Sequence, residues 1–287
     1  HTTVYPVLDG TWHALPVEFY VFHDGLFIRQ ADPGYRDAVG GRVLRIGAVS
    51  ADEALNRVGE ITARDNPMTV RWIAPRLLSC AEVLDALDIT DGLDRVDVEI
   101  ADPAGARRVV SLKSFPLDPS LMHGLPPGYV SMADAATAPR PLWLKEPDNP
   151  YWFEAVPDED LVYFQFNGVR NRDEGETLRD FTKRLFDSMR ADPPDALVID
   201  VRRNNGGNNF LIKPILDAIL AAPEINQTGH LFVITGRSTF SACQNFVNRL
   251  EREARPMFVG EPTGSRPNFV GEDNVIILPW SGLQMSG

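Results

Sequence analysis

The stretch "HLFVITGRSTFSACQNFVNRLE", residues 230–251, decides how the second half of the chain folds. Residues 230–235 form a short apolar run typical of a buried strand, and residues 240–253 have the character of an amphipathic helix. A serine, Ser241, stands where the helix begins. That position suits a nucleophile, because the hydroxyl lies at the positive end of the helix dipole with the N–H of Ala242 beside it. It also suits a serine that only caps the helix.

The alternation of strand and helix continues on both sides of this stretch. We expect strands at 161–167, 196–201 and 256–260, and helices at 177–190 and 210–221. Repeated strand–helix units predict a parallel sheet, and functional loops then lie at the carboxyl ends of the strands. The fold class predicted for this half is therefore an α/β core.

A second loop of interest, "NNGG", follows the strand at 196–201. Its paired glycines, Gly206 and Gly207, allow positive φ angles and expose bare N–H groups that can bind an oxyanion. The alternative is a tight turn that needs glycine for its geometry alone. The loop by itself does not decide between the two.

The chain before residue 151 has a different pattern. Residues 18–113 contain short strands, two helices and Gly-rich corners, which predict a small, partly open β-barrel. Residues 114–150 are rich in proline and have no strand or helix period, as in a linker. We expect residues 1–17 to pack on the α/β core, and that core to occupy residues 151–287 and to be incomplete at its C-terminal end. The whole chain is then of the mixed α/β class.

Composition excludes several kinds of partner. The 287 residues carry a formal net charge of −12 with basic residues scattered among the acids, which argues against nucleic acid. No apolar run is long enough for a membrane span. The two cysteines, Cys80 and Cys243, form no C-x-x-C pair, so a thiolate metal site is not expected, and nothing calls for a cofactor. Two buried thiols are expected, with a single disulfide as the alternative. The oligomeric state has no signal in the sequence.

Three segments together match a known pattern: "ALVIDVRRNNGG", "FVITGRSTFSACQNFVNRLE" and "FVGEPTG". Their order and spacing resemble the C-terminal processing, or tail-specific, serine peptidase family, whose members show R-N-N-G-G, S-A-S-E at a helix start and V-G-E-P-T. The segment "ADPGYRDAVGGRVLRIGAVSADEAL" resembles the PDZ-like domain of the same family, although Gly41-Arg42 replaces the usual Gly-Asp. The resemblance implies a crotonase-like or ClpP-like α/β core with a PDZ-like β domain over residues 18–113.

The resemblance also implies roles for individual residues. Ser241 corresponds to the nucleophile and Ala242 to an oxyanion donor. Gly206 and Gly207 correspond to the oxyanion loop. Gln244 stands at the glutamate of S-A-S-E, and Thr263 is the threonine that follows G-E-P.

The base differs from the family pattern. Many members use a lysine shortly after that threonine, whereas this chain has Ser265 and Arg266 there. Arginine stays protonated, so it cannot accept the serine proton. Tricorn-like members use a histidine in a short D-G-H-T or S-H stretch before the PDZ-like unit, and "HTTVYPVLDG" places His1 there. The nearest acids to orient it are Glu261 and Glu272, although Glu261 is better suited to forming the turn before Thr263.

The remaining histidines are expected to have no catalytic part. His13 and His23 flank the first strands of the chain, and His123 lies in the proline-rich region. His230 begins a strand at the end opposite the loops. All four are expected at the surface or in packing.

Three functions fit these observations. The first is a serine endopeptidase that acts on unfolded or C-terminally presented polypeptides, bound by the PDZ-like unit through strand addition. The second is a catalytically degenerate peptide-binding scaffold, favoured by the missing lysine. The third is a crotonase-type enzyme acting on a thioester, which gives the PDZ-like unit no role. Family analogy, together with a chain that opens on His1 and closes near a strand, suggests a processed or partial chain from a periplasmic or extracellular protein.

Overall fold

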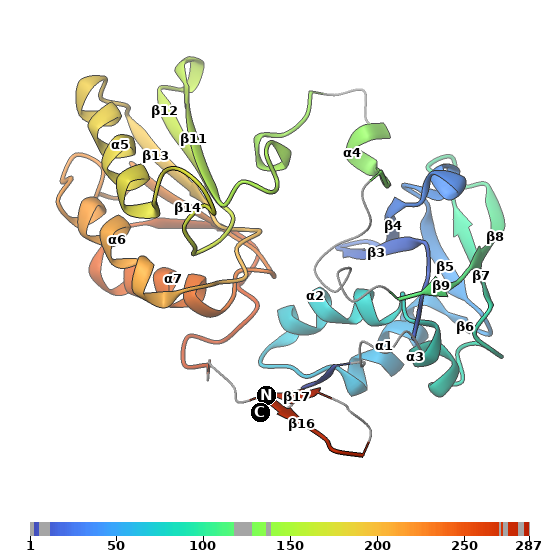
Figure 1. Ribbon diagram of the computed structural model, residues 1–287. Helices are drawn as coiled ribbons and strands as arrows, with labels where there is room; N and C mark the ends of the chain where they lie inside the picture. Colours follow the sequence, from blue (N-terminus) through green and yellow to red (C-terminus); the bar gives the residue numbers. More distant parts are fainter. Residues whose placement is uncertain are drawn as a thin grey trace. The chain divides into compact units, whose positions relative to one another are not determined.

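The computed structural model describes residues 3–5, 12–117, 128–135, 139–269, 271, 275–280 and 284–286. The chain divides into two units (Figure 1). The first consists of His1–Arg64, Val70–Arg140 and Glu272–Gly287, and the second of Asp65–Thr69 and Pro141–Gly271. Each unit has its own cluster of buried apolar side chains.

The units are bounded differently from the segments expected from the sequence. Residues 12–17 belong to the first unit, where the N–H of Leu15 donates to the carbonyl of Ser79 at 2.8 Å. Residues 275–280 belong to the first unit as well, whereas residues 141–150 belong to the second.

The first unit is built on a seven-stranded sheet of order β10-β4-β5-β7-β8, with β3 beside β4 and β6 beside β5. These strands are β3 (Val17–Phe22), β4 (Gly25–Ala31), β5 (Arg42–Ile46), β6 (Val49–Ser50), β7 (Arg95–Ala101), β8 (Arg107–Lys113) and β10 (Val130–Ser131). The smaller pairings are β2 (His13–Ala14) with β9 (Phe115–Pro116), and β1 (Thr3–Tyr5) with β17 (Gln284–Ser286) and β16 (Val275–Ile277).

Short helices accompany these strands. They are η1 (Pro33–Ala38), α1 (Ala51–Ile61), α2 (Pro67–Leu77), α3 (Ala81–Ala86) and α4 (Met132–Ala135); the first residues of α2, up to Thr69, are grouped with the second unit. Ser50 caps α1, because its Oγ accepts a hydrogen bond from the N–H of Glu53 at 3.2 Å. Two helices were expected among residues 18–113, and the structure has α1, α2 and α3 there in addition to the short η1.

The second unit contains a five-stranded sheet in chain order, β11-β12-β13-β14-β15. The strands are β11 (Tyr151–Val156), β12 (Leu161–Phe166), β13 (Ala196–Asp200), β14 (Leu231–Thr235) and β15 (Met257–Gly260). The strand β11 pairs antiparallel with β12, and the other neighbours are parallel. The sheet thus confirms the mixed α/β class, with one antiparallel strand that the sequence analysis did not include.

Three helices connect the parallel strands: α5 (Leu178–Ala191), α6 (Lys213–Leu220) and α7 (Ser241–Glu253). The short helices η3 (Leu142–Leu144), η4 (Pro157–Glu159) and η5 (Asn209–Leu211) complete the unit. Because each strand pairs with the next one in the chain and crossovers are right-handed, the three helices lie on one face of the sheet. The helix α6 contacts both α5 and α7, as Figure 1 shows. In the described part of the chain, no helix is long and apolar enough to cross a membrane.

The helices face the sheet through apolar side chains. Thr177 caps α5, and the residues that α5 buries include Phe181 and Leu185. The helix α7 buries Phe246 and Leu250 in the same core. Each such aromatic or leucine side chain contributes about 2 kcal/mol when it is fully removed from water. This packing fixes the start of α7 relative to the carboxyl ends of the strands.

Candidate active site

The two loops selected from the sequence follow neighbouring parallel strands. Asp200, the last residue of β13, pairs with Ile234 near the end of β14. Both strands therefore end at the same edge of the sheet, and residues 201–208 and 236–240 leave that edge side by side.

Hydrogen bonds join the two loops directly. The N–H of Phe240 donates to the carbonyl of Asn204 at 3.1 Å, and Asn204 Oδ1 accepts from the N–H of Gly206 at 3.0 Å. The hydroxyl of Thr239 donates to the carbonyl of Val201 at 2.9 Å. Asn204 and Thr239 are fully buried, so these bonds are shielded from water and hold the loops in one arrangement.

Ser241 has an unusual backbone conformation at the start of α7. Its φ is +51°, in the left-handed region that non-glycine residues rarely adopt. Phe240 is the N-cap residue, in extended conformation and without a side-chain capping bond. The alternative that Ser241 caps the helix is therefore wrong. A strained serine between a strand and a helix instead resembles the geometry that exposes a nucleophile.

Gly206 approaches Ser241 so closely that no side chain would fit. Its φ is +113°, and a Cβ added there would lie 2.6 Å from the Cβ of Ser241 and 3.0 Å from the backbone nitrogen of Ala242. A side chain at 206 would displace the serine or that N–H, so glycine is what allows the two to stay next to this loop. In such an arrangement a serine hydroxyl and a backbone N–H can act on one carbonyl group.

Gly207 is held from the other side by the loop that follows β12. The N–H of Val169 donates to the carbonyl of Gly206 at 2.8 Å, and the N–H of Asn208 donates to the carbonyl of Val169 at 2.7 Å. A Cβ on Gly207 would lie 2.3 Å from that same Val169 oxygen. Glycine at 207 is therefore required by close backbone contact, and the "NNGG" loop is held in place at both of its glycines.

Two N–H groups remain available at this place. In the part of the chain that the structure describes, no backbone hydrogen bond has the N–H of Gly207 or of Ala242 as its donor. Ala242 lies in the first turn of α7, where N–H groups have no intrahelical acceptor. The positive end of the helix dipole adds to their attraction for a negatively charged oxygen.

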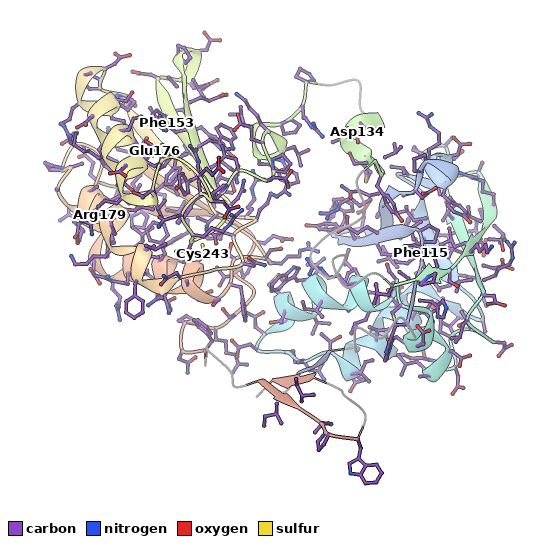
Figure 2. All side chains as sticks on the ribbon, in the orientation of Figure 1. Phe115, Asp134, Phe153, Glu176, Arg179 and Cys243 are labelled. Carbon is purple, nitrogen blue, oxygen red and sulfur yellow. The ribbon has the colours of Figure 1, made fainter. Side chains whose placement is uncertain are left out.

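Cys243, two residues beyond Ser241, is unsuited as a competing nucleophile. The side chain is fully buried on α7 (Figure 2), and burial raises the pKa of its thiol well above the ordinary value. A buried, protonated thiol is a poor nucleophile. Ser241, by contrast, is only partly buried.

The side chains of Gln244 and Thr263 form hydrogen bonds in the structure that surrounds Ser241. Gln244 is buried one turn after the serine, and its Oε1 accepts from Ser265 Oγ at 3.3 Å while its Nε2 donates to Asn248 Oδ1 at 2.8 Å. Thr263 Oγ1 donates to the carbonyl of Ser265 at 3.0 Å. Gln244 therefore holds Ser265 against the start of α7, and the Thr263 bond stabilises the turn at residues 263–265.

The position of the family lysine is occupied by residues with other partners. Ser265 is buried, and the N–H of Arg266 donates to the carboxylate of Asp65 at 2.5 Å. Glu261 forms an ion pair with the buried Arg237 in the turn after β14. The carboxylate of Glu261 thus stabilises the turn that leads to Ser241.

The histidines are distributed as follows. His230 stands immediately before β14, at the edge of the sheet opposite the loops, and its Nδ1 lies 2.5 Å from the carbonyl oxygen of Asp195. His13 pairs with Glu82 in the first unit, and the side chain of His23 is almost fully exposed. His1, His123 and Glu272 lie outside the described residues. Within the described part of the second unit, the only histidine is His230, which lies at the edge of the sheet opposite to Ser241.

A buried polar cluster at the same sheet edge was not identified from the sequence. Tyr163 OH donates to Asp200 Oδ2 at 2.7 Å, and Arg202 Nε donates to both oxygens of that carboxylate. Burial and the Asp200 charge raise the pKa of Tyr163, so the phenol stays protonated. The cluster joins β12 to the start of the loop that contains Gly206 and Gly207. The only signal of this cluster in the sequence is a tyrosine on one strand and an aspartate on the next.

Comparison with known proteins supports the fold. No family model matches the chain, and no curated protein matches its sequence. Two solved structures of mature CPAF, one of them complexed with lactacystin, are similar, with TM-scores of 0.65 and 0.63. They are 13% and 14% identical in sequence; the match covers 96% of this chain in both cases, and 74% and 73% of CPAF. At this identity the similarity shows the fold alone, and the mixed α/β fold expected from the sequence is confirmed.

Proposed function

We propose that the chain is a serine-type endopeptidase of the tail-specific kind that hydrolyses polypeptides with Ser241 as its nucleophile. One observation carries this proposal. The left-handed backbone of Ser241 places it against Gly206, beside two N–H groups that have no acceptor in the described part of the chain. Drift would have no reason to retain a strained serine, a glycine without room for a Cβ and available amides together.

In the proposed reaction, Ser241 Oγ forms a bond to the carbonyl carbon of the substrate as it loses its proton to a base. The carbonyl oxygen becomes negatively charged and accepts hydrogen bonds from the N–H groups of Ala242 and Gly207. Collapse of this intermediate breaks the C–N bond, and the amine leaves with the proton from the base. Water then hydrolyses the acyl-serine ester and restores the hydroxyl.

The identity of the base that accepts the Ser241 proton is also a proposal. The guanidinium of Arg266 stays protonated and cannot serve. The resemblance to tricorn-like members supports His1, which would accept the proton of Ser241. Glu261 is paired with Arg237, so the acid that orients such a histidine is not assigned to it.

The first unit is proposed to bind the polypeptide. Its resemblance to a PDZ-like domain supports capture of an extended or C-terminal peptide by strand addition. The same resemblance supports a periplasmic or extracellular location. A thioester substrate would leave this unit without a part in the reaction.

Hydrolysis of casein by single variants tests the proposal. Ser241→Ala is expected to lower the rate at least about a thousandfold, as loss of a nucleophile does. Ser238→Ala is the matched control, because Ser238 lies in the same turn and is also partly buried. For the base, His1→Ala is compared with His23→Ala, which alters an exposed side chain.

The outcomes separate the proposals. A loss with Ser241→Ala and His1→Ala, but with neither control, is the expected result. A loss with Ser241→Ala alone would retain the nucleophile and reject His1. Wild-type protein that cleaves no unfolded substrate over a range of pH would overturn the peptidase, and the missing lysine would then favour a peptide-binding scaffold.

A further inference from the structure

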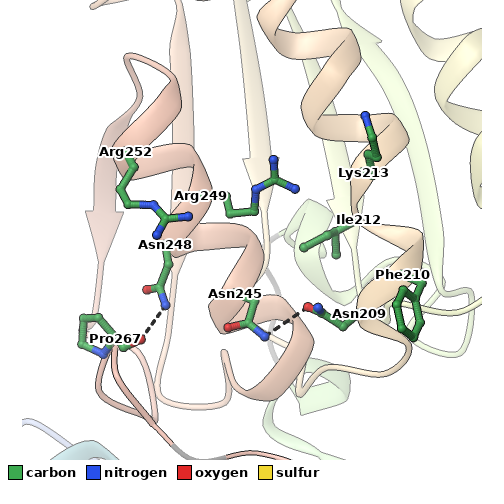
Figure 3. Close-up of a pocket in the computed structure, with 9 residues that line it drawn as sticks. All are labelled: Asn209, Phe210, Ile212, Lys213, Asn245, Asn248, Arg249, Arg252 and Pro267. Carbon is green, nitrogen blue, oxygen red and sulfur yellow. Dashed lines mark hydrogen bonds between the residues drawn. The ribbon is translucent and has the colours of Figure 1, made fainter.

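A pocket of about 520 Å³ lies in the second unit between η5, the start of α6 and α7 (Figure 3). One wall consists of Asn245, Asn248, Arg249 and Arg252 on α7. The other includes Phe210 and Lys213. None of the residues described above as the candidate catalytic set lines it.

Both walls start at the candidate active site. On α7, Asn245 follows Ser241 by four residues and Arg252 by eleven, so both share the face of the serine. On the other side, Asn209 and Phe210 follow the oxyanion loop directly. Asn245 Nδ2 donates to Asn209 Oδ1 at 3.1 Å and links the walls near this end. We call this pocket the groove; its end at Asn209 and Asn245 is the end nearer to Ser241 along both walls.

The groove is basic in an acidic protein. The chain has a net charge of −12, yet three of the nine lining residues are Lys or Arg and none of the nine is acidic. Lys213 pairs with Asp217, and Arg249 and Arg252 lie near Glu253. The side chains of Lys213 and Arg252 remain 69% and 70% exposed, so they can still donate to a ligand.

An exposed aromatic side chain accompanies these charges. Phe210 is 87% exposed, which is unusual for phenylalanine. It stands three residues before Lys213, in the pocket lining. An apolar ring beside basic groups suits an extended polypeptide that carries a carboxylate, because the ring contacts the chain and the basic groups bind the charge.

We propose that this groove is a specificity subsite for an acidic side chain of the polypeptide substrate. This inference rests on the proposed function, because it takes the bound polypeptide to be the substrate of Ser241. The helical rise places Arg249 and Arg252 about 12 to 16 Å along α7 from Ser241. An extended chain covers that distance in about four or five residues. The acidic residue therefore lies about four or five positions from the bond that is cleaved.

Peptide binding tests the groove without catalysis. Full-length Ser241→Ala protein is titrated with fluorescent peptides that carry Glu, Gln or Lys four and five positions from a central bond. The Glu peptide is expected to bind about fivefold more tightly than the Gln peptide, as partly exposed charge-assisted bonds allow. Adding Lys213→Gln and Arg252→Gln is expected to remove this preference.

A matched control removes the same charges elsewhere in the unit. Lys183 and Arg190 lie on α5, are exposed and pair with Asp187, so Lys183→Gln with Arg190→Gln repeats the change outside the groove. The control is expected to keep the preference for Glu. Equal binding of the Glu and Gln peptides, or a preference that survives the groove substitutions, would overturn the proposal.

The binding result is independent of the casein result. A chain that cleaves casein without preferring Glu would retain the peptidase and reject the groove. A preference for Glu that depends on Lys213 and Arg252 supports the groove whether or not cleavage is observed, and absence of cleavage then counts only against the catalytic function.

Discussion

At the scale of single residues, the contact between Gly206 and Ser241 explains why both residue types are needed. The serine adopts φ +51°, and the glycine adopts φ +113° against it. A side chain at 206 would collide with Ser241 and crowd the N–H of Ala242, the two groups that the proposed reaction uses. Backbone strain of the kind seen at Ser241 is typical of functional sites.

Gly206→Ala is therefore expected to lower kcat/KM by at least about a hundredfold, as loss of an oxyanion site does. Gly175→Ala is the control, since Gly175 has φ +87° and nothing within 4 Å of an added Cβ. Gly175→Ala is expected to destabilise the fold by about 1 kcal/mol through the positive φ, and Gly206→Ala by more, because its Cβ also clashes with Ser241. Peptidase assays and urea unfolding measure the two effects. Equal activity of the two variants would contradict the role given to Gly206.

At the scale of elements, the turn from β14 to α7 depends on one buried hydroxyl. Thr239 Oγ1 accepts from the N–H of Gly236 at 3.1 Å and donates to the carbonyl of Val201 at 2.9 Å. Thr239→Val removes both bonds in a buried place and is expected to cost about 2 kcal/mol of unfolding free energy. Urea denaturation followed by circular dichroism measures this loss.

Thr182→Val serves as the comparison. Thr182 is also buried, but its hydroxyl donates to the carbonyl of Leu178 four residues earlier in α5, as helical threonines commonly do. Its replacement is expected to cost less than about 1 kcal/mol. A Thr239→Val protein as stable as Thr182→Val would show that the turn does not depend on the hydroxyl.

Most elements of the second unit could be predicted from the sequence. The apolar run at 196–201 and the cap at Thr177 are local signals, and they gave β13 and α5 to within a residue or two. The strand β11 was missed because it follows a proline-rich stretch and is defined by pairing with β12. The helix α2 was missed because it begins at Pro67 and contains Pro75, and prolines usually interrupt helices.

The site was predictable in part for the same reason. Ser241 and the glycine pair lie in local motifs at strand ends, where topology alone brings them together. The positive φ of Ser241 and the Tyr163–Asp200–Arg202 cluster arise from contacts between distant segments, which a local pattern does not encode. The base could not be identified from the sequence, because the family lysine is absent and His1 alone is a weak match to the histidine pattern.

At the scale of the whole molecule, each unit buries its own core and contains one free cysteine, Cys80 in the first and Cys243 in the second. Of the two thiols that were expected to be buried, Cys243 is buried and Cys80 only partly so. Desolvation raises the pKa of Cys80 to about 11 and raises that of Cys243 as well. The thiolate, which is the reactive form, is therefore scarce at pH 8 in the folded chain.

Alkylation by iodoacetamide at pH 8 is accordingly expected to be slow at both thiols in native buffer and fast in urea. Mass spectrometry of the two cysteine peptides across a urea series reports the unfolding of each unit separately. Native labelling of either thiol at its unfolded rate would contradict the burial described here.

Reaction with a fluorophosphonate probe shows whether Ser241 is a nucleophile that the folded site activates. Native protein is treated with the probe, and the modified peptide is identified by mass spectrometry. We expect one adduct, on Ser241, which is lost in urea and in Ser241→Ala but kept in Ser238→Ala. An unmodified Ser241 in the native wild-type protein, or an adduct that persists in Ser241→Ala, would contradict it.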